Sequence, residues 1–342
     1  MPLESLDPPC TPLAPSGETG GLHRGGKTES ISVIIPSWNG VTLLPPCLDS
    51  LRAQTYRDSE IWVVDSASSD ETVALVRRDY PEVHLLPLAE NLGYSGAVNA
   101  GIARASGTLI AVLNQDVVVD AHWLEEIARA AEAHPQAGAI ASKIMLYDQR
   151  DHLHSAGDDY RTDGIPVNRG VWQVDEGQYD GEVEIFGACG GAATYRRAML
   201  DEVGLLDESF FMYCEDVDLA WRHQLAGWRA VFAPRAIAYH HLSASGGGVT
   251  ASYYTGRNTL YVIAKNVPGP MLRKYWPAIL AAQWRITRDA LRAWRGEAAR
   301  ARLRGQLAGW LTWPRLLGKR RAIQQSRRVS LEYLEGLLKR DS

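Results

Sequence analysis

The chain has 342 residues, of which 46% are hydrophobic, so it is long and apolar enough to form one large globular domain with an appendage. Its four cysteines lack CxxC or metal-ligand spacing, which disfavours a disulfide framework and makes a reducing cytosol the expected compartment. We find neither a secretory signal pattern nor an apolar run of about 18 residues, so neither secretion nor a spanning helix is predicted.

The formal net charge of −4 conceals a strong asymmetry along the chain. Residues 268–342 hold 17 Lys and Arg against 5 Asp and Glu, while the preceding residues hold 19 against 35. A basic tail on an acidic body predicts an anionic partner for the tail.

The first half of the chain predicts alternating strands and helices. Residues 1–29 hold five prolines and no apolar period, which predicts a disordered leader. Strands are expected at 31–36, 60–65, 83–87 and 108–113, with helices at 41–53, 70–80 and 94–105 and a capping box formed by Ser68 and Glu71. This order predicts an α/β fold, with a mostly parallel sheet and helices on both faces.

The second half is less regular. The polar residues 147–184 predict loops and short antiparallel strands, and order returns with an apolar strand at 185–195. The chain then predicts helices at 196–203 and 215–226 and strands at 229–233 and 236–239. These elements complete a main domain that we place at 30–267. Residues 268–342 predict an amphipathic helical tail, interrupted at Pro314, in which Trp276, Leu280, Trp284 and Leu291 recur at helical spacing between arginines.

Polar side chains follow the expected strands at their carboxyl ends, where open parallel sheets bind ligands. Ser37 and Asn39 follow the first strand and are able to reach a ribose or phosphate, and Asp65 ends the second strand, where it could accept the ring N–H of a base. An alternative role for Asp65, with Ser68, is simple loop and cap formation.

Two further segments suit an anionic ligand. No G-x-G-x-x-G follows the first strand, which disfavours a dinucleotide site, but residues 91–101 form a glycine-rich loop that enters a helix. Asp116 follows the apolar run 109–113, where a carboxylate could hold a divalent cation against a diphosphate. The competing role, a helix cap, suits Asp120 better than Asp116.

Acidic residues at 215, 216 and 218 open an expected helix. Favourable interaction with the helix dipole explains Asp218, which we expect to be an exposed first-turn acid. Glu215 and Asp216 directly follow the apolar run 210–214, where partial burial would adapt a carboxylate for general-base work. His240 ends the last strand, and a metal ligand and an ordinary satisfied histidine are equally weighted there.

Taken together, these segments resemble the family-2 glycosyltransferases, specifically their rhamnosyltransferase-like branch, over residues 32–267. The resemblance implies a GT-A fold, which is Rossmann-like, and a hexosyltransferase that uses a nucleotide-sugar donor with Mg²⁺ or Mn²⁺. It also implies inversion at the anomeric carbon by direct displacement.

The resemblance also implies a role for individual residues. The positions similar to the family's donor site are Pro36, Ser37, Asn39, Asp65, Asn91, Gly93, Asn99, Asn114 and Gln115. Asp116 lies in the place of the second acid of the family's Asp-x-Asp motif. Asp116 and His240 together match the family's metal ligands. Asp216 is similar to the family's base, with Glu215 beside it. Asn114 replaces the first acid of Asp-x-Asp, a substitution that the rhamnosyltransferase-like branch often shows. Its side chain offers a carbonyl oxygen but no charge, so weaker and unchanged metal binding both stay open.

The expected reaction is transfer of L-rhamnose from dTDP-rhamnose to a glycan or lipid-linked acceptor in cell-surface polysaccharide synthesis. A catalytically weak or inactive homologue that only binds nucleotide-sugar or glycan is the alternative. For the tail, we favour an anionic membrane surface over a nucleic acid, because lipid explains the Trp and Leu stripe as well as the arginines. The expected location is cytoplasmic and peripheral, on the inner face of the cytoplasmic membrane.

Overall fold

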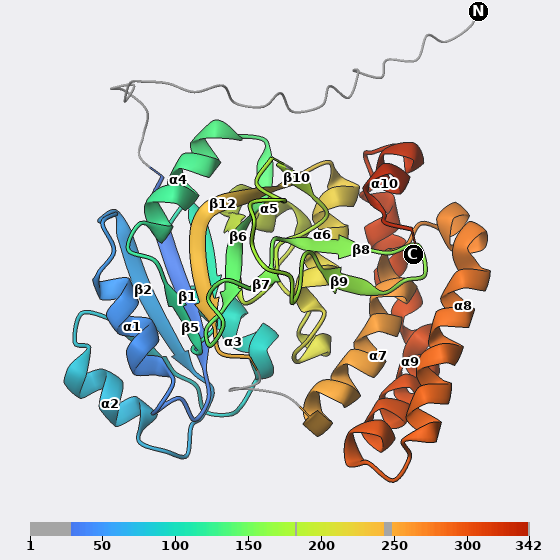
Figure 1. Cartoon of the computed structure of the whole chain (residues 1–342), viewed down its shortest axis with the longest axis horizontal. Coiled ribbons are helices and arrows are strands. Elements are labelled where there is room, and N and C mark those ends of the chain that lie inside the picture. The colour runs from blue at the N-terminus through green and yellow to red at the C-terminus, as the bar shows by residue number, and fades with distance from the viewer. Residues whose placement is uncertain (1–28, 182, 243–247, 341–342) are drawn as a thin grey trace, which may run out of the picture.

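A computed structural model describes residues 29–181, 183–242 and 248–340 (Figure 1). The predicted leader at residues 1–28 lies outside this part of the chain. The strands are β1 (Ile31–Ser37), β2 (Ser59–Asp65), β3 (His84–Pro87), β4 (Leu109–Leu113), β5 (Val117–Val119), β6 (Ala137–Leu146), β7 (Leu153–Ser155), β8 (Asp158–Tyr160), β9 (Pro166–Asn168), β10 (Glu184–Ile185), β11 (Ala192–Arg196) and β12 (Arg229–His240).

The helices, like the strands, are spread along the described chain. They are α1 (Leu44–Arg52), α2 (Thr72–Asp79), α3 (Gly93–Ile102), α4 (Trp123–Ala133), α5 (Arg197–Val203), the 3-10 turn η1 (Glu208–Phe210), α6 (Glu215–Ala226), α7 (Gly248–Asn266), α8 (Gly269–Arg292), α9 (Glu297–Gln325) and α10 (Leu331–Leu337). No helix in these described segments is both long and apolar enough to cross a membrane.

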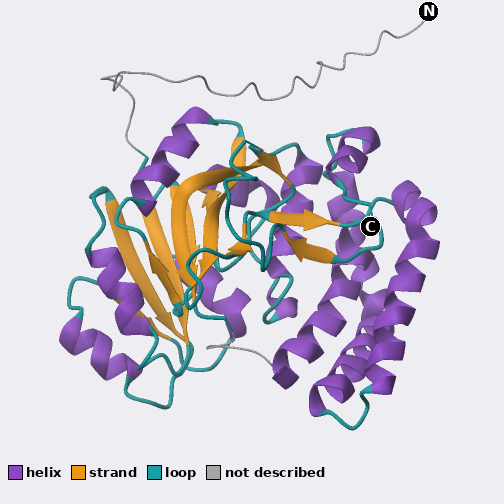
Figure 2. Ribbon diagram, in the orientation of Figure 1, coloured by secondary structure: helices purple, strands orange, loops and turns teal. Residues whose placement is uncertain are grey.

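One mixed sheet forms the centre of the molecule, in the order β10-β12-β6-β11-β4-β1-β2-β3 (Figure 2). The pairings make β1, β2, β3, β4, β6 and β12 run in one direction, with β11 reversed between β4 and β6. The carboxyl ends of β1, β4 and β12 therefore meet at one edge of the sheet, where ligands bind in open α/β folds.

Apolar cores cover both faces of this sheet, as the sequence predicted. Because side chains alternate along a strand, Val33 and Ile35 of β1 join a core with α1 and α4, while Ile34 joins α3, α5 and α6 on the opposite face. Burial on both faces explains why β1 and β4 are continuous apolar runs.

Several predicted elements need correction. The single strand expected at 185–195 is divided into β10 and β11, and the strands expected at 229–233 and 236–239 are one strand, β12, with an irregular register between Ala233 and Ile237. The capping box does not form: the Ser68 hydroxyl donates to Asp65, the side chain of Glu71 caps nothing, and Asp70 accepts from the first amide of α2, that of Thr72, at 3.1 Å.

The tail is helical, but the break expected at Pro314 is wrong, since α9 continues through it. Close packing against α7 holds α9 in place. A side chain at Gly256 would meet the backbone of Arg302, and one at Gly305 would meet the backbone of Tyr253. The helix just before the boundary at 267 therefore packs directly on a helix of the tail.

Candidate functional site

A cavity of about 900 Å³ opens at the carboxyl edge of the sheet. It receives side chains from the ends of β1, β4 and β12, from the start of α3 and α6, and from the β7 to β9 segment. The expected site residues that line it are Pro36, Ser37, Asn91, Gly93, Asn114, Gln115, Asp116, Glu215, Asp216 and His240.

Asn39 and Asp65 are not among the residues that line the cavity. The Asp65 carboxylate is buried and accepts hydrogen bonds from the Ser68 amide, at 3.0 Å, and from the Ser68 hydroxyl. The Asn39 amide donates to the Ser68 hydroxyl at 2.8 Å, and its side-chain oxygen accepts from the Ser69 amide at 2.9 Å. In this structure both residues join the loops after β1 and β2, and the contacts of Asp65 with Ser68 are those of the loop-forming alternative.

Asn99 also lies outside the cavity lining. Its side chain donates to the Leu206 carbonyl at 2.8 Å and accepts from the Leu206 amide at 3.1 Å, so it fastens α3 to the segment before η1. Gln115 lines the cavity, but its side chain accepts from the Ser37 hydroxyl at 2.7 Å and holds the ends of β1 and β4 together.

Asn91 and Gly93 form the entrance to α3. The Asn91 side chain accepts a hydrogen bond from the Gly93 amide at 2.8 Å. Gly93 has φ of +70°, and a Cβ there would collide with the ring and carbonyl of Phe211. Only glycine fits this position, because both the left-handed backbone and the close approach exclude a side chain.

Asp116 and His240 come together on the cavity wall. The Asp116 Oδ1 atom lies 3.2 Å from Nε2 of His240, although 124 residues separate them in the chain. The Asn114 Oδ1 atom is buried on the same wall without a hydrogen-bond partner among the described residues. A carboxylate, an imidazole and an amide oxygen on one wall suit a divalent cation such as Mn²⁺ or Mg²⁺.

The sequence analysis missed His154, which also lines the cavity. Its Nδ1 lies 3.0 Å from Nδ1 of His240. Burial, followed by the proximity of His240, lowers the pKa of His154 to about 3, so this ring is neutral. His154 lies in the irregular segment 147–184, where no period or neighbouring motif distinguished it.

A strained turn positions Glu215 and Asp216 in the lining of the same cavity. Phe211, Tyr213 and Cys214 all have positive φ near 65°, which non-glycine residues rarely adopt outside functional sites. The buried Asn258 side chain holds this turn, because its amide group donates to the carbonyls of Phe210, Met212 and Tyr213. The turn is therefore fixed from α7, on which Asn258 lies.

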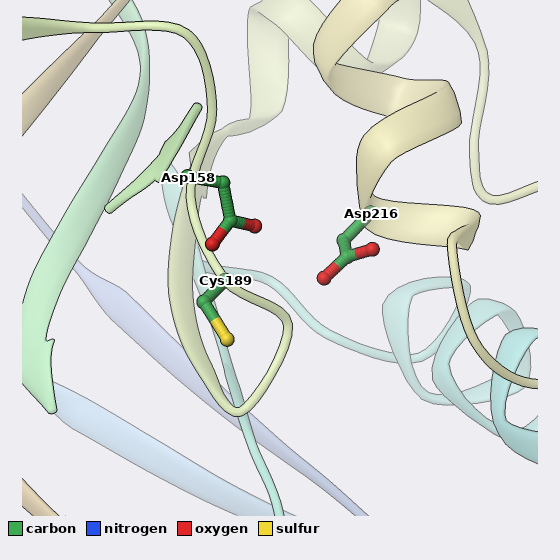
Figure 3. Close-up of side chains that lie close together, drawn as sticks. All are labelled: Asp158, Cys189 and Asp216. Atoms are coloured by element: carbon green, nitrogen blue, oxygen red, sulfur yellow. The ribbon is translucent and has the colours of Figure 1, made fainter. Parts of the chain in front are cut away.

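Asp216 faces Asp158 and Cys189 (Figure 3). The carboxylate oxygens and the sulfur through which these three side chains could hold a metal ion lie within 4.8 Å of one another. The Asp216 Oδ2 atom accepts from the Gly190 amide at 2.8 Å, and Oδ1 accepts from the Val217 amide at 2.7 Å. Burial raises the pKa of Asp216, and burial together with Asp216 raises the pKa of Glu215 well above its usual value. Asp158 and Cys189 were not expected as site residues.

Asp218 differs from the expectation of an exposed acid. It is completely buried and contacts Lys265 at 2.6 Å, Arg222 at 2.9 Å and Asn266 at 2.8 Å. Burial alone would raise its pKa, but Lys265 and Arg222 outweigh it and lower the pKa. Asp218 is therefore a structural ion-pair residue, which joins α6 to α7.

The geometry combines two chemical functions in one cavity. Asp116 and His240 offer cation ligands beside the strand ends, where an anionic group would bind. Asp216, from the start of α6, offers a carboxylate with a raised pKa that is suited to take a proton from a hydroxyl.

Solved structures with a similar fold define the class. The mannosyltransferase PcManGT of Pyrobaculum calidifontis, solved with GDP-Man and Mn²⁺, matches with a TM-score of 0.52 at 19% identity, covering 91% of this chain and 84% of its own. Residues 1–349 of S. aureus TarS, solved with UDP, match with a TM-score of 0.52 at 16% identity, covering 90% of this chain and 92% of that one. The fold is therefore GT-A, as the sequence predicted.

Residues 32–204 match the model of glycosyl transferase family 2, and the chain belongs to this family. The N-acetylglucosaminyl-diphospho-decaprenol L-rhamnosyltransferase of Mycobacterium tuberculosis is 28% identical over 332 residues, covering 90% of this chain and 99% of that protein. The chain is thus a glycosyltransferase of the rhamnosyltransferase-like kind, and the resemblance seen in the sequence is confirmed.

Proposed function

We propose that this enzyme is an inverting, metal-dependent glycosyltransferase that moves L-rhamnose from dTDP-rhamnose to a hydroxyl of a lipid-linked or glycan acceptor. The observation that carries the proposal is that the Asp116 and His240 pair and the Asp216 carboxylate line one cavity. The name of the mycobacterial relative supports the choice of rhamnose and of a diphospholipid-linked acceptor.

Each residue has a defined task in this reaction. Asp116 and His240 would hold the cation, which stabilises the negative charge growing on the leaving diphosphate. Asp216 takes the proton of the acceptor hydroxyl as its oxygen attacks the anomeric carbon. The carbon–oxygen bond to the diphosphate breaks on the opposite side, so the configuration inverts and no covalent enzyme intermediate forms.

We propose further that the enzyme binds the cytoplasmic face of an anionic membrane through the α8 stripe, which we define as Leu280, Trp284 and Leu291. These side chains share one face of α8, and Trp284 is 64% exposed. Exposed Arg288 and Arg292 lie before and after Leu291 on the same helix and supply positive charge. Apolar side chains with interleaved arginines suit a surface of anionic lipid, where a lipid-linked acceptor would reside.

A donor screen tests the proposed reaction. Purified enzyme is incubated with dTDP-rhamnose, UDP-sugars and GDP-mannose, with and without Mn²⁺, and with a short-chain polyprenyl-diphospho-N-acetylglucosamine as acceptor. We expect product only from dTDP-rhamnose and only with the cation. Transfer from a different donor would overturn the choice of rhamnose but leave the reaction type intact.

A further inference from the structure

His154 approaches the proposed metal site from a strand on which the sequence predicted no site residue. It lies on β7, which pairs with β6, and His240 ends β12, which pairs with the other edge of β6. The pairing brings the two imidazole rings together, with centroids 4.8 Å apart. Both rings line the cavity.

The two nitrogens that face each other determine the tautomers of both rings. Nδ1 of His240 and Nδ1 of His154 lie 3.0 Å apart, a distance at which one nitrogen must carry the proton and the other must accept it. The other nitrogen of His240, Nε2, faces Asp116 at 3.2 Å. With His240 neutral, as a metal ligand must be, two arrangements are compatible with the contact between the rings, and they differ in which His240 nitrogen carries the hydrogen.

If His154 donates, Nε2 of His240 carries the hydrogen and donates it to Asp116, and no lone pair remains there for a cation. If His240 donates, its Nε2 lone pair points to Asp116, as a metal ligand requires. A metal-binding histidine commonly donates its second N–H to a fixed acceptor, which sets the tautomer and the ring orientation.

We propose that His154 is the positioning residue of the cation site: its Nδ1 accepts the Nδ1 hydrogen of His240 and so directs Nε2 of His240 toward the cation. This inference rests on the proposed function, because it assumes a cation between Asp116 and His240. It gives a role to a residue that does not itself touch the cation or the donor.

The test measures cation affinity rather than turnover. Mn²⁺ is titrated into the full-length protein with dTDP present, and free Mn²⁺ is followed by electron paramagnetic resonance. His154→Leu removes the acceptor, so we expect the Kd for Mn²⁺ to rise about 10- to 100-fold. His154→Asp offers a carboxylate acceptor to the same N–H and should bind Mn²⁺ within about threefold of the unmodified protein.

His152→Ala is the matched control. His152 lies two residues away, contacts Asp151 and does not line the cavity, so its loss should leave the Kd unchanged. An unchanged Kd for His154→Leu would overturn the proposal, and so would a His154→Asp variant as weak as His154→Leu. Should His154→Leu fail to fold, His154→Ala takes its place in the same comparison, because alanine also offers no acceptor to the Nδ1 hydrogen of His240.

The result also separates this inference from the proposed function. If the unmodified protein binds no Mn²⁺ in the presence of dTDP, the metal site itself is wrong. If it binds Mn²⁺ and His240→Ala removes the binding while His154→Leu does not, only the role of His154 is wrong.

Discussion

At the scale of single residues, Asp216 is the group on which the proposed transfer depends. Backbone amides of Gly190 and Val217 fix its carboxylate, so it is oriented in the cavity before an acceptor arrives. Asp216→Asn keeps the size of the side chain but removes the base, and we expect a fall in transfer rate of about 10² to 10⁴.

Donor affinity separates this role from a binding role. It should survive in Asp216→Asn, because this change leaves the Asp116 and His240 pair intact. Glu215→Gln is the comparison variant. Initial rates measured while dTDP-rhamnose is titrated report both the transfer rate and the donor affinity. A near wild-type rate for Asp216→Asn would remove it from the mechanism and move attention to Glu215.

The pH dependence follows from the environment of Asp216. Burial raises the pKa of Asp216 above the ordinary 3.8, and the group acts as a base only when ionised. The rate should therefore be full above the raised pKa. As pH falls, the rate should begin to decline at a higher pH than it would with an exposed aspartate as the base. A pH profile of kcat at saturating Mn²⁺ measures this, and an acidic limb at or below 3.8 would contradict it.

The sequence predicted Asp116, Asp216 and His240 because each directly follows a strand or an apolar run. It could not predict His154 or Asp158, since both lie in an irregular segment, and only the pairing of β7 with β6 and of β8 with β9 defines their positions. The sequence also pointed to Asn39, Asp65 and Asn99 as donor-site residues. In this structure their side chains make loop and helix contacts.

At the scale of elements, α6 and α7 are joined through buried charges. Asp218 of α6 contacts Lys265 and Asn266 of α7, and removing one member of a buried ion pair leaves the other uncompensated. Asp218→Asn should therefore lower the free energy of unfolding by about 3 to 5 kcal/mol. Urea denaturation measures it, with the exposed Asp201→Asn of α5 as control. Equal stability of the two variants would contradict this account of Asp218.

The sequence predicted most elements of the first half closely, because strands that are buried on both faces are continuous apolar runs, which stand out from the helices between them. The strand expected at 185–195 was wrong because its glycines bring the loop against α6: a Cβ at Gly190 would crowd Asp216. Pro314 did not end α9, because tertiary packing against α7 supports the helix on both sides of it. Local propensity could not show either contact.

At the scale of the whole molecule, α7, α8 and α9 form a helical layer beside the sheet domain (Figure 1). Deleting the chain from residue 268 would uncover Leu260 and Ile263 of α7, which are completely buried. Point substitutions therefore test the membrane proposal more cleanly than truncation. The charge asymmetry was visible in the sequence. The close packing of α9 on α7 was not, because it depends on glycines that no sequence pattern marked as contact positions.

The triple change Leu280→Ser, Trp284→Ser and Leu291→Ser should reduce sedimentation with vesicles of anionic phospholipid at low salt. Each side chain is substantially exposed, so the fold should persist and soluble donor hydrolysis should be unchanged. Vesicles of neutral phospholipid are the control. If the unmodified protein does not sediment with anionic vesicles, the α8 stripe serves another purpose.

The most direct test of the central claim, that Asp116 and His240 hold a cation needed for sugar transfer, is the turnover of dTDP-rhamnose in EDTA and after Mn²⁺ is restored. We predict that EDTA abolishes turnover by the unmodified enzyme, that Mn²⁺ restores it, and that Asp116→Ala is inactive in both conditions. Full turnover in EDTA would contradict the account.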